Sequence, residues 1–290
     1  MDKAFTVQII KNDLFSGELF LPHKADTGLA AVVIMNSSAG VCDIRERFYA
    51  RFLAEAGIAA LAVDSFSPRG IVETIRDQSQ IADQTMEADA YAAFDCLVGD
   101  PRFDATRIAV MGVSKGGQTT INTALLARRA WFRRPAQDFA ARIALVPPAH
   151  MQQRDARTDG RPMLMLLAEK DDYTGVSPAL AYADRMRRSG NNAIKTVIYP
   201  NAHHAWECTG PPIWLAEAEK YSHCLFFVED NAELTEETSG RRMTVQEFLR
   251  NRERYRALGA HVGGGTANLK KEAASAIVQF LQEDVGWRLP

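Results

Sequence analysis

The stretch Gly112-Val113-Ser114-Lys115-Gly116 constrains the fold of this chain more than any other part of its sequence. It has the pattern Gly-x-Ser-x-Gly, with an apolar, β-branched run before it and a segment of helical character, residues 118–128, after it. In this strand–turn–helix setting the pattern is typical of a nucleophile elbow. The serine of such an elbow is strained, and both glycines are needed because strand and helix come close together there. A structural glycine-rich turn is the alternative.

An elbow would give two neighbouring residues distinct chemical roles. The tight turn exposes the Ser114 hydroxyl at the end of the strand, and it leaves the backbone N–H of Lys115 free to bind an oxyanion. A serine hydroxyl is a poor nucleophile unless a base removes its proton, and a third group must hold that base in one tautomer. We therefore expect an acid and a histidine, each in a loop after a strand.

The sequence contains both groups in the chain order that the elbow requires. An apolar strand, residues 162–168, is followed by Asp171 and Asp172, and a later strand, residues 194–199, is followed by His203 and His204. The order serine, acid, histidine is the one expected of this motif. Asp172 is the alternative to Asp171 as the acid, and His203 is the alternative to His204 as the base.

The rest of the chain alternates between predicted strands and helices, which indicates a mostly parallel sheet with helices on both faces. A hairpin over residues 5–21 would lie at one edge. The remaining predicted elements are strands at 29–35, 58–63 and 141–146 and helices at 43–56, 80–97 and 178–188, with a final helix that begins after Thr266. In such a fold the active site lies at the carboxyl ends of the strands.

We interpret residues 1–290 as a single domain that carries one insertion, residues 205–255. This segment holds several aromatic residues and a polar acidic stretch, and it does not follow the strand–helix alternation. We expect it to pack near the active site without a hydrophobic core of its own.

Composition excludes several other classes of protein. The chain is 47% hydrophobic and 24% charged, as in an ordinary globular enzyme. Its net charge of −2 gives no reason to expect nucleic acid or an anionic membrane as a partner. No apolar run approaches the roughly 20 residues of a membrane span, and residues 1–8 lack the features of a secretory signal. We therefore expect a cytoplasmic protein.

The four cysteines show neither metal-binding spacing nor the density of a disulfide scaffold. Reduced thiols are expected in a cytoplasmic protein. A bridge between Cys208 and Cys224 is the alternative. No His, Cys or Asp spacing suggests zinc, and no glycine-rich loop follows a strand in the way that phosphate binding requires, so we expect no metal and no cofactor.

In three stretches the sequence resembles the dienelactone hydrolase family of α/β-hydrolases. These are the elbow at residues 112–117, the acid loop at 168–174, and the segment 199–206, which is similar to the family's Y-P-G-A-x-H-x-F. The resemblance extends from Asn36 to the segment 259–264. It implies the α/β-hydrolase fold, and it assigns the acid to Asp171 and the base to His204.

The chain departs from the family's pattern at three places. Dienelactone hydrolases proper have a cysteine where this chain has Ser114. The loop that reads H-G-x-x-G in many relatives is Asn36-Ser37-Ser38-Ala39-Gly40 here, which by position makes the N–H of Ser38 the second oxyanion donor. The insertion is present in only some relatives, and we expect it to influence substrate choice.

Four further residues are candidates for substrate binding: Phe66, Arg69, Tyr173 and Trp206. Arg69, like Arg45, could pair with a substrate carboxylate, because guanidinium binds carboxylate in a bidentate manner. Surface or structural ion pairs are the favoured interpretation for both arginines. We expect His150 and His261 to make local hydrogen bonds, and the Lys115 side chain to be solvated.

Taken together, these features predict a serine hydrolase that cleaves a small-molecule ester or lactone through an acyl-enzyme on Ser114, without a cofactor. An amidase or small peptidase with the same residues is one alternative. A hydrolase-like binding protein without catalysis is the other, favoured by the departure at residues 36–40.

Overall fold

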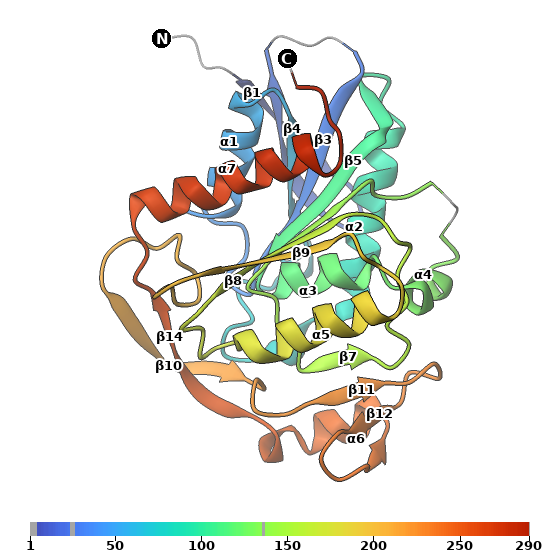
Figure 1. The fold of residues 1–290 in the computed structure, drawn as a ribbon, viewed down its shortest axis with the longest axis vertical. Coiled ribbons are helices and arrows are strands. Elements are labelled where there is room, and N and C mark those ends of the chain that lie inside the picture. Colours follow the sequence, from blue (N-terminus) through green and yellow to red (C-terminus); the bar gives the residue numbers. More distant parts are fainter. Residues whose placement is uncertain (1–4, 24–26, 135–136, 290) are drawn as a thin grey trace.

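A computed structural model describes residues 5–23, 27–134 and 137–289, so the start of the chain at residues 1–4 lies outside the described part. Its centre is an eight-stranded sheet in the order β1-β2-β4-β3-β5-β6-β8-β9 (Figure 1). Neighbours from β4 to β9 in this order are parallel, and β2 pairs antiparallel with both β1 and β4. The strands are β1 (Phe5–Lys11), β2 (Ser16–Pro22), β3 (Leu29–Met35), β4 (Ala59–Asp64), β5 (Phe103–Val113), β6 (Arg142–Leu145), β8 (Met163–Ala168) and β9 (Ile194–Tyr199).

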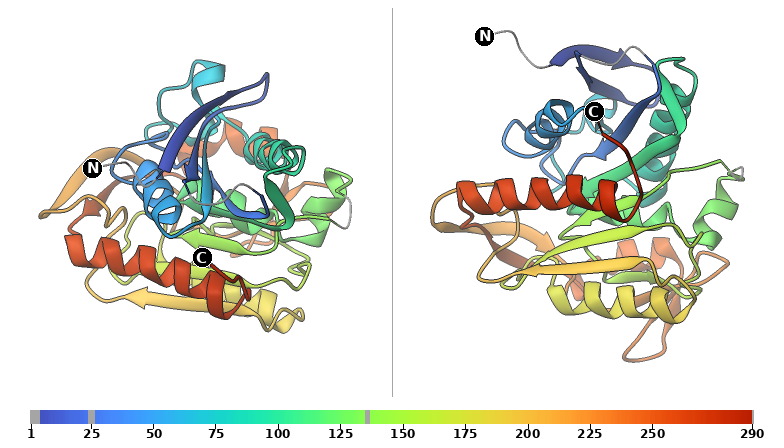
Figure 2. Two further views of the ribbon diagram at one scale, coloured as in Figure 1. Left: turned by 90° about the horizontal axis from the view of Figure 1, so that it is seen from above. Right: turned by 45° about the horizontal axis from the view of Figure 1, so that its top comes forward.

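Helices cover both faces of this sheet, as the sequence predicts. The helices α1 (Glu46–Glu55) and α7 (Ala267–Glu283) pack on one face, and α2 (Asp83–Val98), α3 (Lys115–Asn122) and α5 (Val176–Arg188) pack on the other (Figure 2). All seven residues of β3 are buried, which explains its uninterrupted apolar sequence. The predicted α/β fold with a mostly parallel sheet is thus confirmed.

The predicted cap of the last helix is also present. The side chain of Thr266 accepts a hydrogen bond from the N–H of Leu269 at 3.0 Å, which satisfies one of the free N–H groups at the start of α7.

The helix predicted over residues 118–128 is wrong as a single element. The structure divides it into α3 and α4 (Leu126–Trp131), with an irregular segment between them. The carbonyl of Thr123 at this break accepts hydrogen bonds from Tyr91 Oη at 3.4 Å and Arg142 Nη2 at 3.1 Å. These side chains from distant parts of the chain satisfy a carbonyl that a continuous helix would have bonded internally.

The insertion forms a layer at one end of the molecule, drawn in orange in Figure 1. Within it, β10 pairs antiparallel with β14, a strand that follows the predicted insertion, so the chain outside the central sheet extends to Gly263. A second small sheet has the order β13-β12-β11-β7, where β7 precedes the insertion. The elements are β7 (Met151–Gln153), β10 (Pro212–Lys220), β11 (Phe226–Val228), β12 (Leu234–Glu236), β13 (Arg242–Met243), α6 (Val245–Arg250) and β14 (Ala257–Gly263).

The expectation that the insertion has no core of its own is wrong. Its aromatic residues pack into a separate buried cluster, in which the rings of Phe226 and Phe248 lie 5.2 Å apart and those of Phe248 and Tyr255 lie 5.6 Å apart. Aromatic pairs at such distances stabilise a small cluster beyond their burial alone. The insertion is therefore an ordered part of the fold.

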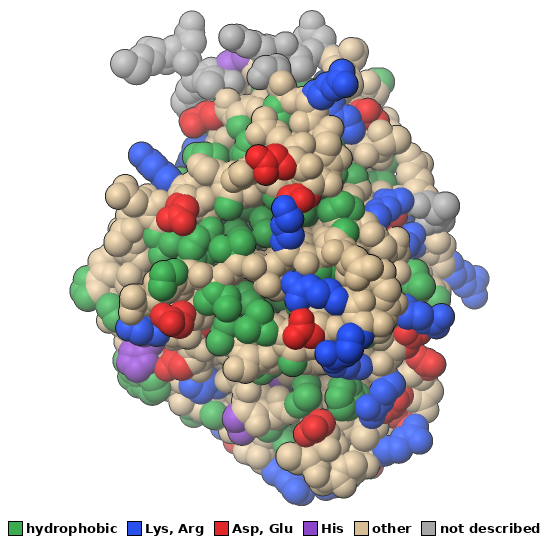
Figure 3. Space-filling view, in the orientation of Figure 1, with side chains coloured by type: hydrophobic (Ala, Val, Ile, Leu, Met, Phe, Trp, Pro, Cys, Tyr) green, Lys and Arg blue, Asp and Glu red, His purple; other side chains and the backbone are tan. Residues whose placement is uncertain are grey.

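Acidic and basic side chains are interspersed over the face of the molecule shown in Figure 3. All four cysteines are free thiols, so Cys208 and Cys224 do not form a bridge. Within the described residues, no helix combines the length and the apolar character needed to cross a membrane.

Candidate active site

Ser114 occupies a sharp turn between β5 and α3. Its φ of 56° and ψ of −118° are a strained combination for a residue with a side chain. A Cβ on Gly112 would overlap the backbone of Gly116, and a Cβ on Gly116 would overlap the carbonyl of Met35 in β3. The two glycines of the motif are thus required by close backbone contacts on both sides of the serine.

Three side chains from separate loops form a continuous hydrogen-bonded chain. His204 Nε2 lies 3.0 Å from Ser114 Oγ, and His204 Nδ1 lies 2.9 Å from Asp171 Oδ2. Each of the three residues is less than 10% exposed. They follow β5, β8 and β9, parallel strands whose carboxyl ends meet at one edge of the sheet.

The turn after β8 orients the Asp171 carboxylate. Its Oδ1 accepts the N–H groups of Tyr173 and Thr174 at 2.9 Å each, and its Oδ2 accepts the Thr174 hydroxyl at 2.7 Å. Burial alone would raise the pKa of Asp171, but His204 and these hydrogen bonds outweigh burial and lower the pKa below its ordinary value. Asp171 is therefore an ionised acceptor for the imidazole.

The two alternatives left by the sequence lie elsewhere. Asp172 bonds to His261, with Oδ1 accepting its backbone N–H at 2.8 Å and Oδ2 lying 2.9 Å from its Nδ1. The ring of His203 lies against His261 at 5.8 Å between centroids. The structure thus brings Asp171 and His204 to Ser114, while Asp172 and His261 join the acid loop to β14.

The backbone N–H groups of Lys115 and Ser38 are both available near Ser114. Lys115 is the first residue of α3, where N–H groups have no partner inside the helix. Ser38 donates its hydroxyl to Gln78 Oε1 at 3.1 Å, and its carbonyl accepts the N–H of Thr74 at 2.8 Å, whereas its own N–H bonds to no described residue. Both residues line the same cavity as Ser114.

The loop that carries Ser38, residues 36–40, is held by buried ionic groups. Glu46 Oε1 accepts the N–H of Ser37 at 3.1 Å and also lies 3.0 Å from Nε of the buried Arg45. The Arg45 guanidinium also contacts the Ser37 hydroxyl. Arg45 is therefore a structural ion-pair residue behind this loop, as one of the two sequence-based interpretations proposed.

A cavity of about 200 Å³ lies in front of Ser114, between the central sheet and the insertion. Polar side chains are part of its lining, among them Gln78, Lys115, Tyr173 and Glu219. The insertion supplies much of its apolar wall: Val228, Leu234, Val245, Phe248 and Leu249.

Two polar side chains in this cavity differ from expectation. The Lys115 side chain is only 7% exposed rather than solvated; its Nζ donates to the carbonyl of Gln78 at 3.1 Å, and burial lowers its pKa. His150 lines the cavity and stacks on Tyr221 with ring centroids 5.3 Å apart. Burial lowers the pKa of His150 to about 4, so its ring is neutral at neutral pH.

Of the four predicted substrate-binding residues, only Tyr173 lines this cavity. Arg69 binds Asp89 through both guanidinium nitrogens at 2.9 Å, a structural ion pair away from Ser114. Phe66 is packed in the core on one face of the sheet, and Trp206 is fully buried against Tyr199. Substrate binding by Phe66 and Trp206 is therefore a wrong prediction, because a place near a site loop in the sequence does not fix where a side chain points. For Arg69 the structure shows the ion pair that the sequence analysis favoured over substrate binding.

Gln78 and Glu219 are site residues that sequence reasoning missed. Neither belongs to a motif, and 141 positions separate them, yet the N–H of Gln78 donates to Glu219 Oε2 at 2.6 Å. Among the described residues, no group of three or more His, Cys, Asp or Glu side chains is arranged to hold a metal ion.

Comparison with known proteins gives one family. The family model described as the dienelactone hydrolase family matches residues 15–234. No curated protein matches the sequence.

Solved structures share the fold at low sequence identity. A protein from Klebsiella pneumoniae, provisionally described as a dienelactone hydrolase, has a TM-score of 0.58 at 19% identity, over 70% of this chain and 88% of that one. Esterase 2 of Thermogutta terrifontis, solved after phosphorylation by paraoxon, has a TM-score of 0.62 at 15% identity, over 99% and 96%. A hyperthermophilic esterase of Pyrobaculum calidifontis has a TM-score of 0.53 at 17% identity, over 69% and 78%. These structures have the α/β-hydrolase fold.

Proposed function

Because the chain belongs to the dienelactone hydrolase family and is thus a hydrolase, we propose that it cleaves carboxylic esters or lactones with Ser114 as nucleophile. The observation that carries this proposal is the hydrogen-bonded chain from Ser114 through His204 to Asp171. An imidazole held between a carboxylate and a hydroxyl is the arrangement that makes a serine reactive.

In the proposed reaction His204 acts first as a base and then as an acid. With its Nδ1 proton donated to Asp171, its Nε2 accepts the Ser114 proton while Oγ attacks the acyl carbon. The imidazolium then donates that proton to the leaving alkoxide as the C–O bond breaks, which leaves an acyl-enzyme on Ser114. Water, deprotonated by the same Nε2, releases the acid and restores the hydroxyl.

The tetrahedral intermediates carry a negative charge on the former carbonyl oxygen. We assign the N–H groups of Lys115 and Ser38 to this oxyanion, because neither bonds to a described residue and both belong to residues lining the cavity of Ser114. A preorganised donor of this kind contributes roughly 3 kcal/mol to transition-state stabilisation. The proposed steps require no cofactor.

The cavity favours small esters that carry an apolar group. Its volume of about 200 Å³ and the apolar side chains from the insertion provide a surface for an acyl or alcohol chain. A small-molecule ester or lactone is therefore the substrate class we propose.

Covalent labelling tests the proposal. We expect a fluorophosphonate to add one phosphonyl group to Ser114 with loss of fluoride, and paraoxon, which phosphorylates the Thermogutta terrifontis esterase, to add one phosphoryl group with loss of p-nitrophenolate. Either reagent should abolish hydrolysis of an activated aryl ester. Mass spectrometry of the digested protein would locate the group. The Ser114→Ala variant should remain unlabelled, and the Ser79→Ala variant, changed at another cavity serine, should label like the wild type. An unlabelled wild-type protein would instead favour the binding-protein alternative.

A further inference from the structure

The loop between β4 and α2, residues 65–82, lies between the Ser38 loop and β10 of the insertion. On one side, the N–H of Thr74 donates to the Ser38 carbonyl at 2.8 Å. On the other side, the carbonyl of Ile75 accepts the N–H of Glu219 at 2.8 Å, and Arg76 Nε bonds to Glu217 at 2.7 Å. This loop is thus in contact with the site on one side and with the insertion on the other.

Gln78 is the residue of this loop with the most connections to the site. Its Oε1 accepts the hydroxyl of Ser38 at 3.1 Å, and its Nε2 donates to the Tyr173 hydroxyl at 3.3 Å. Its N–H donates to Glu219 at 2.6 Å, and its carbonyl accepts the ammonium of Lys115 at 3.1 Å. The four partners belong to the Ser38 loop, the acid loop, the insertion and the elbow.

Glu219 gives this network a fixed acceptor. It is 1% exposed, and its second oxygen accepts the Tyr221 hydroxyl at 2.8 Å. The pairing of β10 with β14 shifts register between Leu215 and Glu219, and irregularities of this kind redirect side chains near active sites. A buried carboxylate is retained only when it is well bonded, so removal of its partner would disturb the surroundings.

The bonds from this loop hold Ser38 at two points and leave its N–H unused. Thr74 fixes the carbonyl of Ser38 and Gln78 fixes its hydroxyl, while the N–H that we assign to the oxyanion has no described partner. Oxyanion stabilisation depends on donors placed before the charge develops. Through its hydrogen bond with the Ser38 hydroxyl, Gln78 can therefore hold the N–H of Ser38 in place.

We propose that Gln78 is a positioning residue for the reaction, which holds the oxyanion donor Ser38 in place and is itself anchored to the insertion through Glu219. The inference rests on the proposed function. The insertion then supports the catalytic geometry in addition to enclosing the cavity.

The experiment compares Gln78→Met with Gln80→Met. Gln80 belongs to the same short 3-10 helix, Gln78–Gln80, but it is exposed and its amide bonds to the carbonyls of Glu73 and Asp77. For Gln78→Met we expect kcat on an activated aryl ester to fall about ten- to a hundredfold with KM within about threefold of the wild type. Binding of a trifluoromethyl ketone, whose adduct with Ser114 carries an oxyanion, should weaken in proportion. Gln80→Met should leave all three quantities unchanged.

Other outcomes would overturn the inference. A raised KM with unchanged kcat would make Gln78 a substrate-binding residue. Unchanged binding of the ketone would show that Gln78 does not contribute to oxyanion stabilisation. If Gln78→Met fails to fold, the Ser38→Ala variant takes its place, because it removes only the hydrogen bond between the Ser38 hydroxyl and Gln78. Ser38→Ala should then lower kcat and weaken ketone binding, as expected for Gln78→Met. A wild-type protein that neither hydrolyses esters nor labels would refute the proposed function itself.

Discussion

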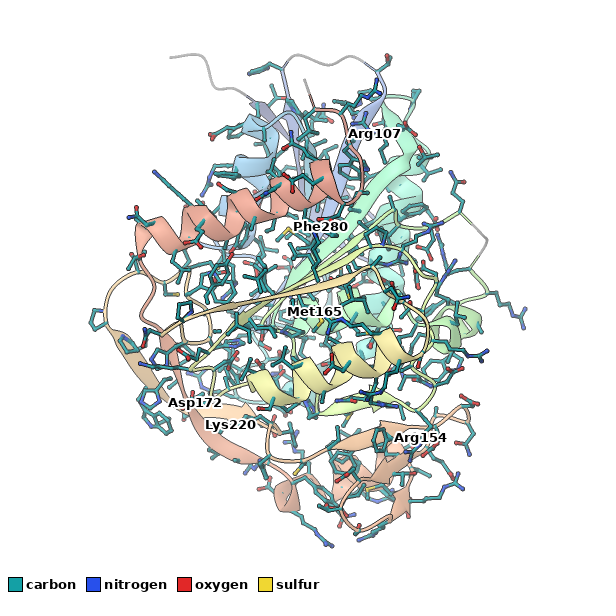
Figure 4. All side chains as sticks on the ribbon, in the orientation of Figure 1. Arg107, Arg154, Met165, Asp172, Lys220 and Phe280 are labelled. Atoms are coloured by element: carbon teal, nitrogen blue, oxygen red, sulfur yellow. The ribbon has the colours of Figure 1, made fainter. Side chains whose placement is uncertain are left out.

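Asp171 and Asp172 are adjacent carboxylates that contact different histidines. Asp171 accepts three hydrogen bonds from its own turn and lies 2.9 Å from His204, whereas Asp172 binds His261 on β14. Figure 4 shows Asp172 beside Lys220, whose Nζ donates to the Asp172 carbonyl at 2.8 Å. Asp171 therefore orients the imidazole of His204, whereas the next residue, Asp172, joins the acid loop to β14.

The variants Asp171→Asn and Asp172→Asn form a matched pair. Asparagine at 171 can donate to the imidazole, which favours the tautomer with its proton on the side of Ser114, so we expect kcat to fall by roughly three to four orders of magnitude. Asp172→Asn should retain kcat within about tenfold. Steady-state kinetics on an activated ester would measure both. A larger loss for Asp172→Asn would assign the acid to the other residue.

At the level of elements, the elbow depends on the contact between α3 and β3. Gly116→Ala would force a Cβ against the Met35 carbonyl, so we expect the free energy of unfolding to fall by about 3 kcal/mol or more. Gly99→Ala is the control, because Gly99 caps α2 at a φ of −73° and its added Cβ would meet no atom closer than 3.4 Å. Urea denaturation would compare the two. Equal stability of both variants would contradict the steric account.

Most of the central sheet could be predicted from the sequence because its strands are short apolar runs separated by polar loops. β3 and β8 match the predicted strands to within a residue. The break after α3 could not be predicted, because it depends on Tyr91 and Arg142 reaching the Thr123 carbonyl. Local spacing contains no information about such contacts.

In the candidate site, too, some features follow from the sequence pattern and others depend on contacts between distant residues. Ser114, Asp171 and His204 follow three strands of a parallel sheet, so their approach to one another follows from the fold class alone. Gln78 and Glu219 meet only because the loop after β4 packs against the insertion. The side-chain directions of Phe66 and Trp206 likewise depend on packing that no sequence pattern specifies.

For the whole molecule, the central sheet and the insertion together set the charge of the cavity. Asp83 and Glu219 contribute two carboxylates to its lining, and Lys115 and Lys220 contribute two ammonium groups. A third cation, Arg128, is paired 3.1 Å from the buried Glu87. Burial raises the pKa of Glu87 to about 7, so the opposite charges balance above that pH, and the cavity then has no excess positive charge with which to attract an anionic substrate.

This balance predicts a preference for uncharged acyl groups, which can be tested with two p-nitrophenyl esters of equal chain length. We expect kcat/KM for the butyrate to exceed that for the succinate monoester about tenfold or more above pH 7, because the second carboxylate would lose its hydration in a cavity whose lining has no net positive charge to compensate. Asp83→Asn removes one cavity carboxylate and should reduce this ratio by about threefold or more. Asp95→Asn is the control, since Asp95 lies on the same helix but pairs with Arg134 away from the cavity. Equal or faster cleavage of the succinate monoester by the wild type would show that the cations dominate the cavity, and the substrate class would then be anionic.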